Sequence, residues 1–594
     1  MRGTKNTTRG MLLALAFAVC SLAGADLQYR VEPDPANESL KLSITIPSPS
    51  EGVRLQMPRW APGSYRLTTN FRNVRDLTAV DESGKAVEVQ HPDDWTWSLA
   101  PSGAKSVTVR YTCPSPMVGG AMHFSGPSTY LYVVDRLREP CTVAFSMPDK
   151  WIVAIGLDES KGAKNTFYAP NYDVLADNPA TLGEFALLGY VVQGKPHFIA
   201  LRGGAADDVD REGLVKACRF VTESEGDFFG GLPYSKYVWH FNVNDSPDGA
   251  GGLEHLSSTQ ISLASGVGPR AVSVLAHEFF HLWNVKRIRS APLGPFDYTQ
   301  LPKTGALWWL EGVTDYYAHH LLHRYGWWDT DRFHQDILDN VRTVRARPQR
   351  LEVSPYDASF RVGEAAGGRG NSQGFGVSYY DTGWLLGLCL DIEIRSQTGG
   401  KRSLDDVMRA LWDLCRNGKP GFAEDEIRKQ CVRFGGPALG PFYDKIVMQP
   451  GELPVEEQLA KIGLRMSERL DRFVDVGFDW AAVRAEQAVR VRNVHGPAKD
   501  RLRDGDRIIE ANGKSLKLPT TRAIYATLQP ILEKATTDEV LLLRVLRDGE
   551  EIEVRILPEL STRTGTKIDD AAPGDLQKRA LREGLYYDGV PHKG

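Results

Sequence analysis

The sequence predicts a multidomain α+β protein, and three observations support this prediction. The chain has 594 residues, which is more than one hydrophobic core organises, so three or four domains are expected. Strand-like alternation dominates up to about residue 190, and helical patterns dominate from Pro269 to about residue 450. A second strand-rich unit follows from about residue 461.

The composition is that of a soluble globular protein. Hydrophobic residues make up 42% and charged residues 25% of the chain, and the formal net charge is -4. A nucleic-acid partner would require a basic patch, and no such patch stands out. We therefore expect no nucleic-acid partner.

Residues 1–25 have the pattern of a signal peptide. Three basic residues precede an apolar run from Met11 to Val19, which leads to the small-residue sequence Ala23-Gly24-Ala25. The apolar run is shorter than the ~20 residues that a spanning helix needs, which argues against a membrane anchor. Cleavage before Asp26 would give a secreted or periplasmic protein with no integral membrane segment.

Residues 26–190 are expected to form a β-rich N-terminal domain. The segments Leu40–Ile46 and Ser106–Tyr111 alternate apolar and polar residues, and turn residues punctuate such runs at short intervals.

Of the six cysteines that remain after cleavage, none lies in a CxxC pair, so they do not look like metal ligands. An oxidising compartment permits disulfides, and the pairings Cys113–Cys141 and Cys415–Cys431 are left open.

Residues 191–460 change to a mixed and then helical pattern. An amphipathic helix is expected at 210–225, a strand at 237–243 and a Gly-rich turn at 249–252. Pro269 suits the first turn of the next helix.

That helix contains the sequence His277-Glu278-Phe279-Phe280-His281. Positions i and i+4 share one helix face, so the two imidazoles can bind one metal ion, and Glu278 lies where it can act as a general base toward metal-activated water. The alternative is a pair of histidines on an amphipathic helix without a metal.

The next expected helix, 308–317, supports the metal site. It carries Glu311, and a catalytic zinc takes three protein ligands and keeps one position open, so His277, His281 and Glu311 form the predicted set for one Zn²⁺ per chain. Asp315, one turn later, is spaced to orient a ligating histidine; a solvated or capping Asp is the alternative. His319, His320 and His323 are expected to form a solvated helix face.

Residues 461–560 form the last expected domain, followed by a charged tail at 561–594 that is expected to be loose. This domain has a hairpin turn at Asp548-Gly549 and supplies none of the proposed ligands. Deleting everything after about residue 460 is therefore expected to leave catalysis intact.

At this point the chain resembles the glycyl aminopeptidase family of gluzincin zinc metallopeptidases, whose members often carry a PDZ domain. Five stretches carry the resemblance: MPRWAPGSY at 57–65, GGLEH at 251–255, HLWNVKRI at 281–288, LWWLEGVTDYY at 307–317 and SYYDTG at 378–383. The 461–560 unit resembles a PDZ domain through GPA, DGDRIIEANG and the residues between them. The family commonly has Lys where this chain has Thr382, which puts specificity or rate in question.

The resemblance implies a thermolysin-like catalytic domain and aminopeptidase activity toward small N-terminal residues such as Gly or Ala. It implies that Glu254, following Gly251 and Gly252 on an edge strand, binds the substrate's ammonium. It also implies that a tyrosine stabilises the carbonyl oxygen, with Tyr380 slightly preferred over Tyr379. The expected partners are peptide substrates and an extended peptide or protein segment at the PDZ-like unit.

The function predicted from the sequence is hydrolysis of N-terminal residues from peptides. Two alternatives stay open: a zinc endopeptidase that uses the same site, and a non-catalytic peptide-binding scaffold that uses the C-terminal and β-rich domains.

Overall fold

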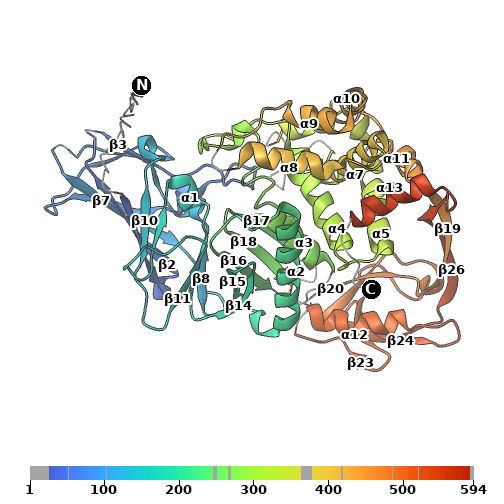
Figure 1. Ribbon diagram of the computed structural model, residues 1–594. Helices are drawn as coiled ribbons and strands as arrows, with labels where there is room; N and C mark the ends of the chain where they lie inside the picture. Colours follow the sequence, from blue (N-terminus) through green and yellow to red (C-terminus); the bar gives the residue numbers. More distant parts are fainter. Residues whose placement is uncertain are drawn as a thin grey trace, which may run out of the picture.

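The computed structural model describes residues 26–50, 52–101, 103–244, 250–264, 269–362, 377–416, 419–483, 486–519 and 521–588. The predicted signal peptide lies outside these ranges, so it and the export that it implies stay predictions. Within them, no helix combines the length and the hydropathy that crossing a bilayer requires. The β-rich region, the mixed and helical centre and the C-terminal unit follow one another along the molecule (Figure 1).

The N-terminal region is β-rich, as the alternating sequence pattern predicts. In β1 every second residue is buried, and this alternation places Leu27, Tyr29 and Val31 in the core. In the described residues the strands form sheets with the orders β12-β10-β1-β2-β7-β4, β5-β6-β3-β9 and β11-β13-β8. The elements are β1 (Leu27–Asp34), β2 (Ser39–Pro47), β3 (Val53–Gln56), β4 (Arg75–Asp81), β5 (Val89–Asp93), β6 (Thr96–Leu99), β7 (Ser106–Pro114), β8 (Ala121–Phe124), β9 (Tyr132–Val133), β10 (Cys141–Phe145), β11 (Ile152–Ile155), β12 (Thr166–Ala169), α1 (Tyr172–Ala176) and β13 (Ala180–Gly183).

The six cysteines beyond residue 25 are all buried free thiols, so neither disulfide left open by the sequence is present. Strands β10 and β7, which carry Cys141 and Cys113, are separated by β1 and β2 in the sheet. Three strand spacings amount to about 14 Å. A disulfide needs Cα atoms within about 7 Å, so the sheet order itself excludes this pair.

A five-stranded sheet with the order β14-β15-β16-β18-β17 opens the next region. Its neighbours β15, β16 and β18 are parallel, and β17 runs antiparallel at the edge, beside α3. Helices α2 and α3 pack on one face of this sheet (Figure 1). The elements are β14 (Ala186–Val192), β15 (Lys195–Arg202), α2 (Arg211–Phe229), β16 (Tyr237–Asn244), β17 (Ala250–Glu254), β18 (Ser258–Ala264) and α3 (Pro269–Phe280).

The centre of the chain is helical and shares one hydrophobic core with α2, α3 and the sheet. Its largest helix, α7, is buried along most of its length, because Trp384, Leu386, Leu388 and Ile392 all face neighbouring helices. The elements are a π-helix (Trp308–Val313), α4 (Thr314–Arg324), α5 (Thr330–Arg345), α6 (Pro355–Phe360), α7 (Tyr379–Thr398), α8 (Leu404–Cys415), α9 (Glu426–Gly435), α10 (Leu439–Val447) and α11 (Val455–Lys461).

The C-terminal unit has its own small core, formed between a sheet with the order β20-β21-β22-β24-β25 and helix α12. Two long paired strands, β19 and β26, connect this unit to the helical centre (Figure 1). The elements are β19 (Leu464–Asp475), β20 (Asp479–Val483), β21 (Ala488–Arg492), β22 (Arg507–Ala511), β23 (Lys514–Ser515), α12 (Thr521–Glu533), β24 (Leu541–Arg547), β25 (Glu550–Ile556), β26 (Glu559–Asp570) and α13 (Leu576–Tyr587).

The expectation of a loose tail after residue 560 is wrong for the described part, which ends at residue 588. Strand β26 pairs with β19 along its whole length, and α13 packs beside α4 and α7. Leu581, Leu585 and Tyr586 are buried in the same core as the central helices. Their spacing of four and one residues puts them on one helix face, so a charged sequence still docks as an amphipathic helix.

Candidate active site

Helix α3 carries His277 and Glu278 on the side that faces the π-helix and β17, and His281 follows its last residue, Phe280, on the same side. The backbone N–H of His281 donates to the His277 carbonyl oxygen at 3.3 Å, which continues the helical turn. The apolar residues Val272, Leu275 and Phe279 bury the opposite side of α3 in the core. The division between an apolar and a polar side fixes how α3 is rotated about its axis, so both imidazoles point toward the π-helix.

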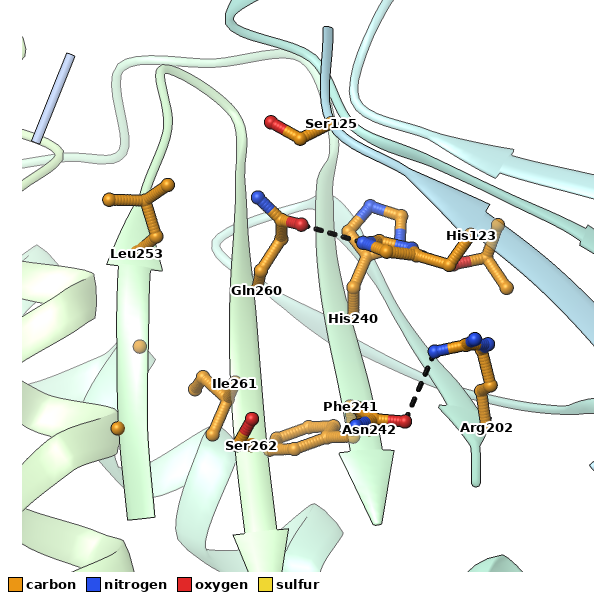
Figure 2. A pocket seen from close by; sticks show the side chains of 13 residues that line it. His123, Ser125, Arg202, His240, Phe241, Asn242, Leu253, Gln260, Ile261 and Ser262 are labelled. Carbon is orange, nitrogen blue, oxygen red and sulfur yellow. Dashed lines mark hydrogen bonds between the residues drawn. The ribbon is translucent and has the colours of Figure 1, made fainter. Parts of the chain in front are cut away.

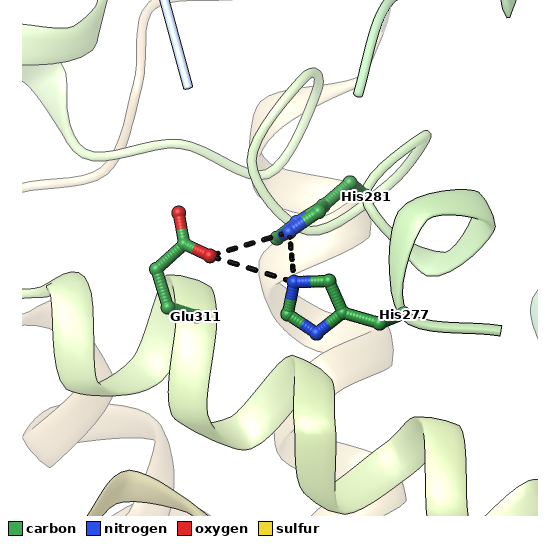
Figure 3. A group of neighbouring side chains, drawn as sticks. All are labelled: His277, His281 and Glu311. Atoms are coloured by element: carbon green, nitrogen blue, oxygen red, sulfur yellow. Dashed lines mark hydrogen bonds and ion pairs between the residues drawn. The ribbon is translucent and has the colours of Figure 1, made fainter. Parts of the chain in front are cut away.

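The third predicted ligand, Glu311, meets the two histidines from the π-helix (Figure 3). Its Oε2 lies 3.3 Å from His281 Nε2 and 3.6 Å from His277 Nε2, and the two Nε2 atoms are 2.8 Å apart. A π-turn inside a helix is rare and frequently marks a functional site. One possible ligand atom from each of the three predicted residues therefore lies within 4.8 Å of the other two, as a metal site requires.

The other ring nitrogen of each histidine faces an oxygen atom. His277 Nδ1 lies 2.8 Å from Asp315 Oδ1, and His281 Nδ1 lies 2.6 Å from the carbonyl oxygen of Asn284. An acceptor at Nδ1 holds the proton there and leaves a lone pair on Nε2, which is the arrangement of a metal-binding histidine. Two lone pairs that face each other across 2.8 Å repel unless a cation lies with them, so this donor set fits Zn²⁺.

The electrostatics of the site also favour a cation. Burial lowers the pKa of His277, but the carboxylates of Asp315 and Glu311 outweigh burial and hold that pKa well above its ordinary value. The pKa of His281 is raised in the same sense: burial and His277 lower it, and Glu311 raises it. Carboxylates that stabilise positive charge on two buried imidazoles would equally stabilise a bound metal ion.

Glu278 lies between the predicted metal ligands and the edge strand β17. It is 6% exposed, and its Oε2 has no hydrogen-bond partner among the described residues. Burial raises the pKa of Glu278 to about 7, and a cation bound nearby would lower it. A Cβ added at Gly252 would lie 2.4 Å from Glu278 Cδ, so only glycine lets the strand pass this closely.

Glu254 ends strand β17 and faces the same cavity as Glu278 and His281, with one ligand atom of each within 4.8 Å of the others. It is 3% exposed, and its Oε1 accepts no hydrogen bond from any described residue. Gly251 points to the other face of the strand, where a Cβ would meet nothing within 4 Å. The structure thus places an unsatisfied buried carboxylate beside the predicted metal ligands, which suits a cationic ligand.

The N-terminal region contributes residues that the sequence alone did not assign to the site. Gly63, with φ +92°, lies against Glu254, because a Cβ at that position would be 2.6 Å from both carboxylate oxygens. A pocket of about 240 Å³ beside Glu254 is lined by Gly63, Tyr65 and Asp177 from this region, together with residues that follow α3. In the sequence, the only signal that the segment 57–65 contributes to the site was its resemblance to the family.

Tyr379 and Tyr380 begin helix α7, next to the π-helix. A Cβ at Gly383 would lie 2.2 Å from the Trp308 carbonyl oxygen and 2.8 Å from Gly312 Cα, so this glycine contact brings α7 against the element that carries Glu311. The two tyrosine rings stack at 4.9 Å, and the Tyr380 ring lies 6.0 Å from that of His277. Burial, followed by the charge of Glu311, raises the pKa of both phenols, which keeps them protonated as hydrogen-bond donors.

Thr382, where the family resemblance suggests Lys, is buried in the first turn of α7 and adds no charge. Its neighbour Asp381 instead pairs with Arg347, at 3.1 Å.

The expectation of a solvated histidine face on α4 is wrong, since His320 and His323 are buried and the His319 side chain is 17% exposed. Helices α5 and α13 cover that face.

Two parts of the chain match known family models. Residues 28–184 match the model described as Peptidase M61 N-terminal domain, and residues 270–386 match the model described as M61 glycyl aminopeptidase. The second match contains all three predicted metal ligands and both tyrosines. No curated protein matches the chain.

One solved structure shares the fold over most of the chain, and two others match it with lower TM-scores. An aminopeptidase N family protein from Idiomarina loihiensis has 23% identity, with 93% of this chain and 100% of that chain covered at a TM-score of 0.72. An M1 zinc metallopeptidase from Deinococcus radiodurans has 15% identity over 72% of this chain and 95% of that chain, with a TM-score of 0.44. Leukotriene A4 hydrolase from Saccharomyces cerevisiae has 12% identity over 74% and 70%, with a TM-score of 0.45.

Proposed function

We propose that this chain is a zinc aminopeptidase that removes small N-terminal residues, Gly or Ala, from peptides. The family match over residues 270–386 supports an aminopeptidase of the metallopeptidase class. The observation on which the proposal rests is the convergence of His277, His281 and Glu311 beside two buried carboxylates, Glu278 and Glu254.

Each residue has a distinct task in the proposed reaction. Zinc held by His277, His281 and Glu311 would supply Lewis acidity for the attacking water and the scissile carbonyl. Glu278 accepts a proton from that water and returns it to the leaving nitrogen. The phenol of Tyr380, or of Tyr379, donates a hydrogen bond to the carbonyl oxygen as negative charge develops there.

Glu254 distinguishes an aminopeptidase from an endopeptidase. A free amino terminus brings a positive charge into a buried site, where an unpaired charge is costly. The unsatisfied Oε1 of Glu254 offers the missing partner. An endopeptidase has no use for such an anion, because the corresponding group of its substrate is a neutral amide.

The test is hydrolysis of Gly- and Ala-p-nitroanilide by the purified full-length chain, with zinc measured by elemental analysis. We expect one zinc per chain, loss of turnover with a chelator and recovery when zinc is added back. Equal cleavage of N-acetylated peptides would favour the endopeptidase. Stoichiometric zinc without any turnover would favour the binding scaffold.

We also propose that the C-terminal unit is a PDZ domain that takes up an extended peptide. Its support is strand β20, which lies at the edge of the sheet with α12 packed beside it. A sheet edge can add a peptide strand through backbone hydrogen bonds. Binding of a peptide library to the full chain, compared with a variant that carries Pro in β20, tests this assignment.

A further inference from the structure

The pocket of about 240 Å³ beside Glu254 has an uneven set of charges. Its lining contains three acidic and two basic side chains, and the rest of the lining is uncharged. The charged residues are Asp173, Asp177, Glu254, Lys286 and Arg289. Three carboxylates and two cations leave one negative charge, which a single positive group would neutralise.

Lys286 is committed to Asp177. Its Nζ lies 2.7 Å from Asp177 Oδ1, and both side chains are 5% exposed. The backbone N–H of Leu256 donates to Asp177 Oδ2 at 2.8 Å, and His255 Nδ1 lies 3.1 Å from Oδ1. Burial raises the pKa of Asp177, but the charge of Lys286 and the hydrogen bond from His255 hold it below its ordinary value, so this carboxylate is ionised.

His255 adds no charge to this count. The carboxylate of Asp177 can only accept, so His255 donates through Nδ1 and its Nε2 is free to accept a hydrogen bond. The side-chain amide nitrogen of Gln260 lies 2.8 Å from that Nε2, and the amide oxygen faces His123 Nε2 at 2.6 Å (Figure 2). This hydrogen-bond order is that of a neutral His255.

Asp173 accepts a hydrogen bond from the Tyr298 hydroxyl at 2.8 Å; burial raises the pKa of Asp173, and this hydrogen bond and the charge of Arg289 act in the opposite direction. The excess negative charge consequently resides on Glu254. Lys286 Nζ is 4.0 Å from Glu254 Oε1, too far for a hydrogen bond, and Oε1 has no other partner among the described residues. The flexible Lys286 side chain could bridge this distance if Asp177 did not hold it. An uncharged residue at position 177 would let Lys286 neutralise Glu254.

We propose that the Asp177–Lys286 pair sets the charge of this pocket at one negative unit, so that the site selects a free ammonium over a neutral group of the same size. The inference rests on the proposed aminopeptidase function and adds two specificity-determining residues to it. Asp177 belongs to the N-terminal region, following α1, so that region supplies part of the substrate selection. Lys286, held by Asp177, adds no net positive charge to the pocket.

The experiment compares glycyl-p-nitroanilide with its glycolyl counterpart, in which a hydroxyl replaces the ammonium. The measured quantity is the ratio of the two kcat/KM values for the zinc-loaded full chain. Asp177→Asn should lower this ratio at least tenfold, because the charge count falls to zero. Asp177→Asn combined with Lys286→Gln restores one negative unit, and the ratio should return to within threefold of the wild-type value.

The matched control is Asp391→Asn, which removes a buried carboxylate paired with Arg395 at 2.9 Å outside this pocket. It should lower stability and leave the ratio unchanged. A ratio unchanged in folded Asp177→Asn, or a double variant no better than the single one, would overturn the proposal. If Asp177→Asn does not fold, Lys286→Gln tests the proposal instead. This variant keeps Glu254 charged, so it should retain the selectivity for ammonium. A tenfold loss of that selectivity would also overturn the proposal.

Calorimetry separates this inference from the proposed function. Wild-type protein that turns over neither substrate but binds glycinamide at least tenfold more tightly than glycolamide would refute the aminopeptidase and retain the charge-setting pair. Turnover of the glycyl substrate with equal binding of the two amides would refute the charge-setting pair alone.

Discussion

Replacing Glu254 by Ala tests whether this carboxylate binds the substrate's ammonium. The side chain is 4% exposed and faces Glu278 and His281. In Glu254→Ala the pocket loses its excess negative charge, and the ammonium of a bound peptide has no partner. Truncating one member of a desolvated charge pair costs roughly 2–5 kcal/mol. A factor of ten in kcat/KM corresponds to about 1.4 kcal/mol, so the loss in kcat/KM should lie between about 30-fold and a few thousand-fold.

The assay is kcat/KM for Gly- and Ala-p-nitroanilide at matched zinc content, wild type against Glu254→Ala and the milder Glu254→Gln. Any residual cleavage of N-acetylated peptides should not change. Glu225→Gln is the control: Glu225 is a buried carboxyl on α2 whose pKa burial raises well above the ordinary value, so neutralising it should change little. A loss smaller than threefold in Glu254→Ala would refute the role of Glu254 and favour the endopeptidase.

Four further predictions follow from the site and the fold. Glu278→Gln should keep zinc and lose on the order of 10²–10⁴ in rate; a zinc-loaded variant of normal activity would remove Glu278 from the mechanism. Asp315→Ala should weaken zinc binding about 10–100-fold in a chelator competition, and unchanged affinity would contradict its contact with His277. Tyr380→Phe should lower kcat more than Tyr379→Phe does, and the reverse order would assign the oxyanion contact to Tyr379. Deleting residues 461–594 should leave little folded protein by circular dichroism, because α13 is removed from the core; a folded, active truncation would show that α13 is dispensable.

The last of these predictions reverses what the sequence suggested. Each buried side chain of Leu581, Leu585 and Tyr586 contributes about 1.5–3 kcal/mol. Their sum is comparable to the ~5–15 kcal/mol that holds a domain folded. His320 Nε2 also lies 2.6 Å from the Leu585 carbonyl oxygen, and the loss of α13 would leave that buried ring without its partner.

Local spacing was sufficient to predict that His277 and His281 lie together. His277 and His281 are one turn apart, and any helix with that spacing brings two imidazoles together. Glu311 was expected on an ordinary helix, but it projects from a π-helix. That distortion accompanies the contact of Gly312 with Gly383, some 70 residues later in the chain, and no local pattern reports such a contact.

The residues that complete the site come from the N-terminal region and required long-range information. Gly63 lies against Glu254, and Asp177 holds Lys286, across about 190 and 109 residues of sequence. Trp60 Nε1 donates to the Asp297 carbonyl oxygen at 2.7 Å, which ties the same segment to the loop after α3. Because both the packing and the charge of the pocket beside Glu254 depend on these contacts, the β-rich region forms part of the proposed active site. On the proposed function, a shift between the two regions that separated Asp177 from Lys286 would therefore change substrate binding before it disturbed His277, His281 and Glu311.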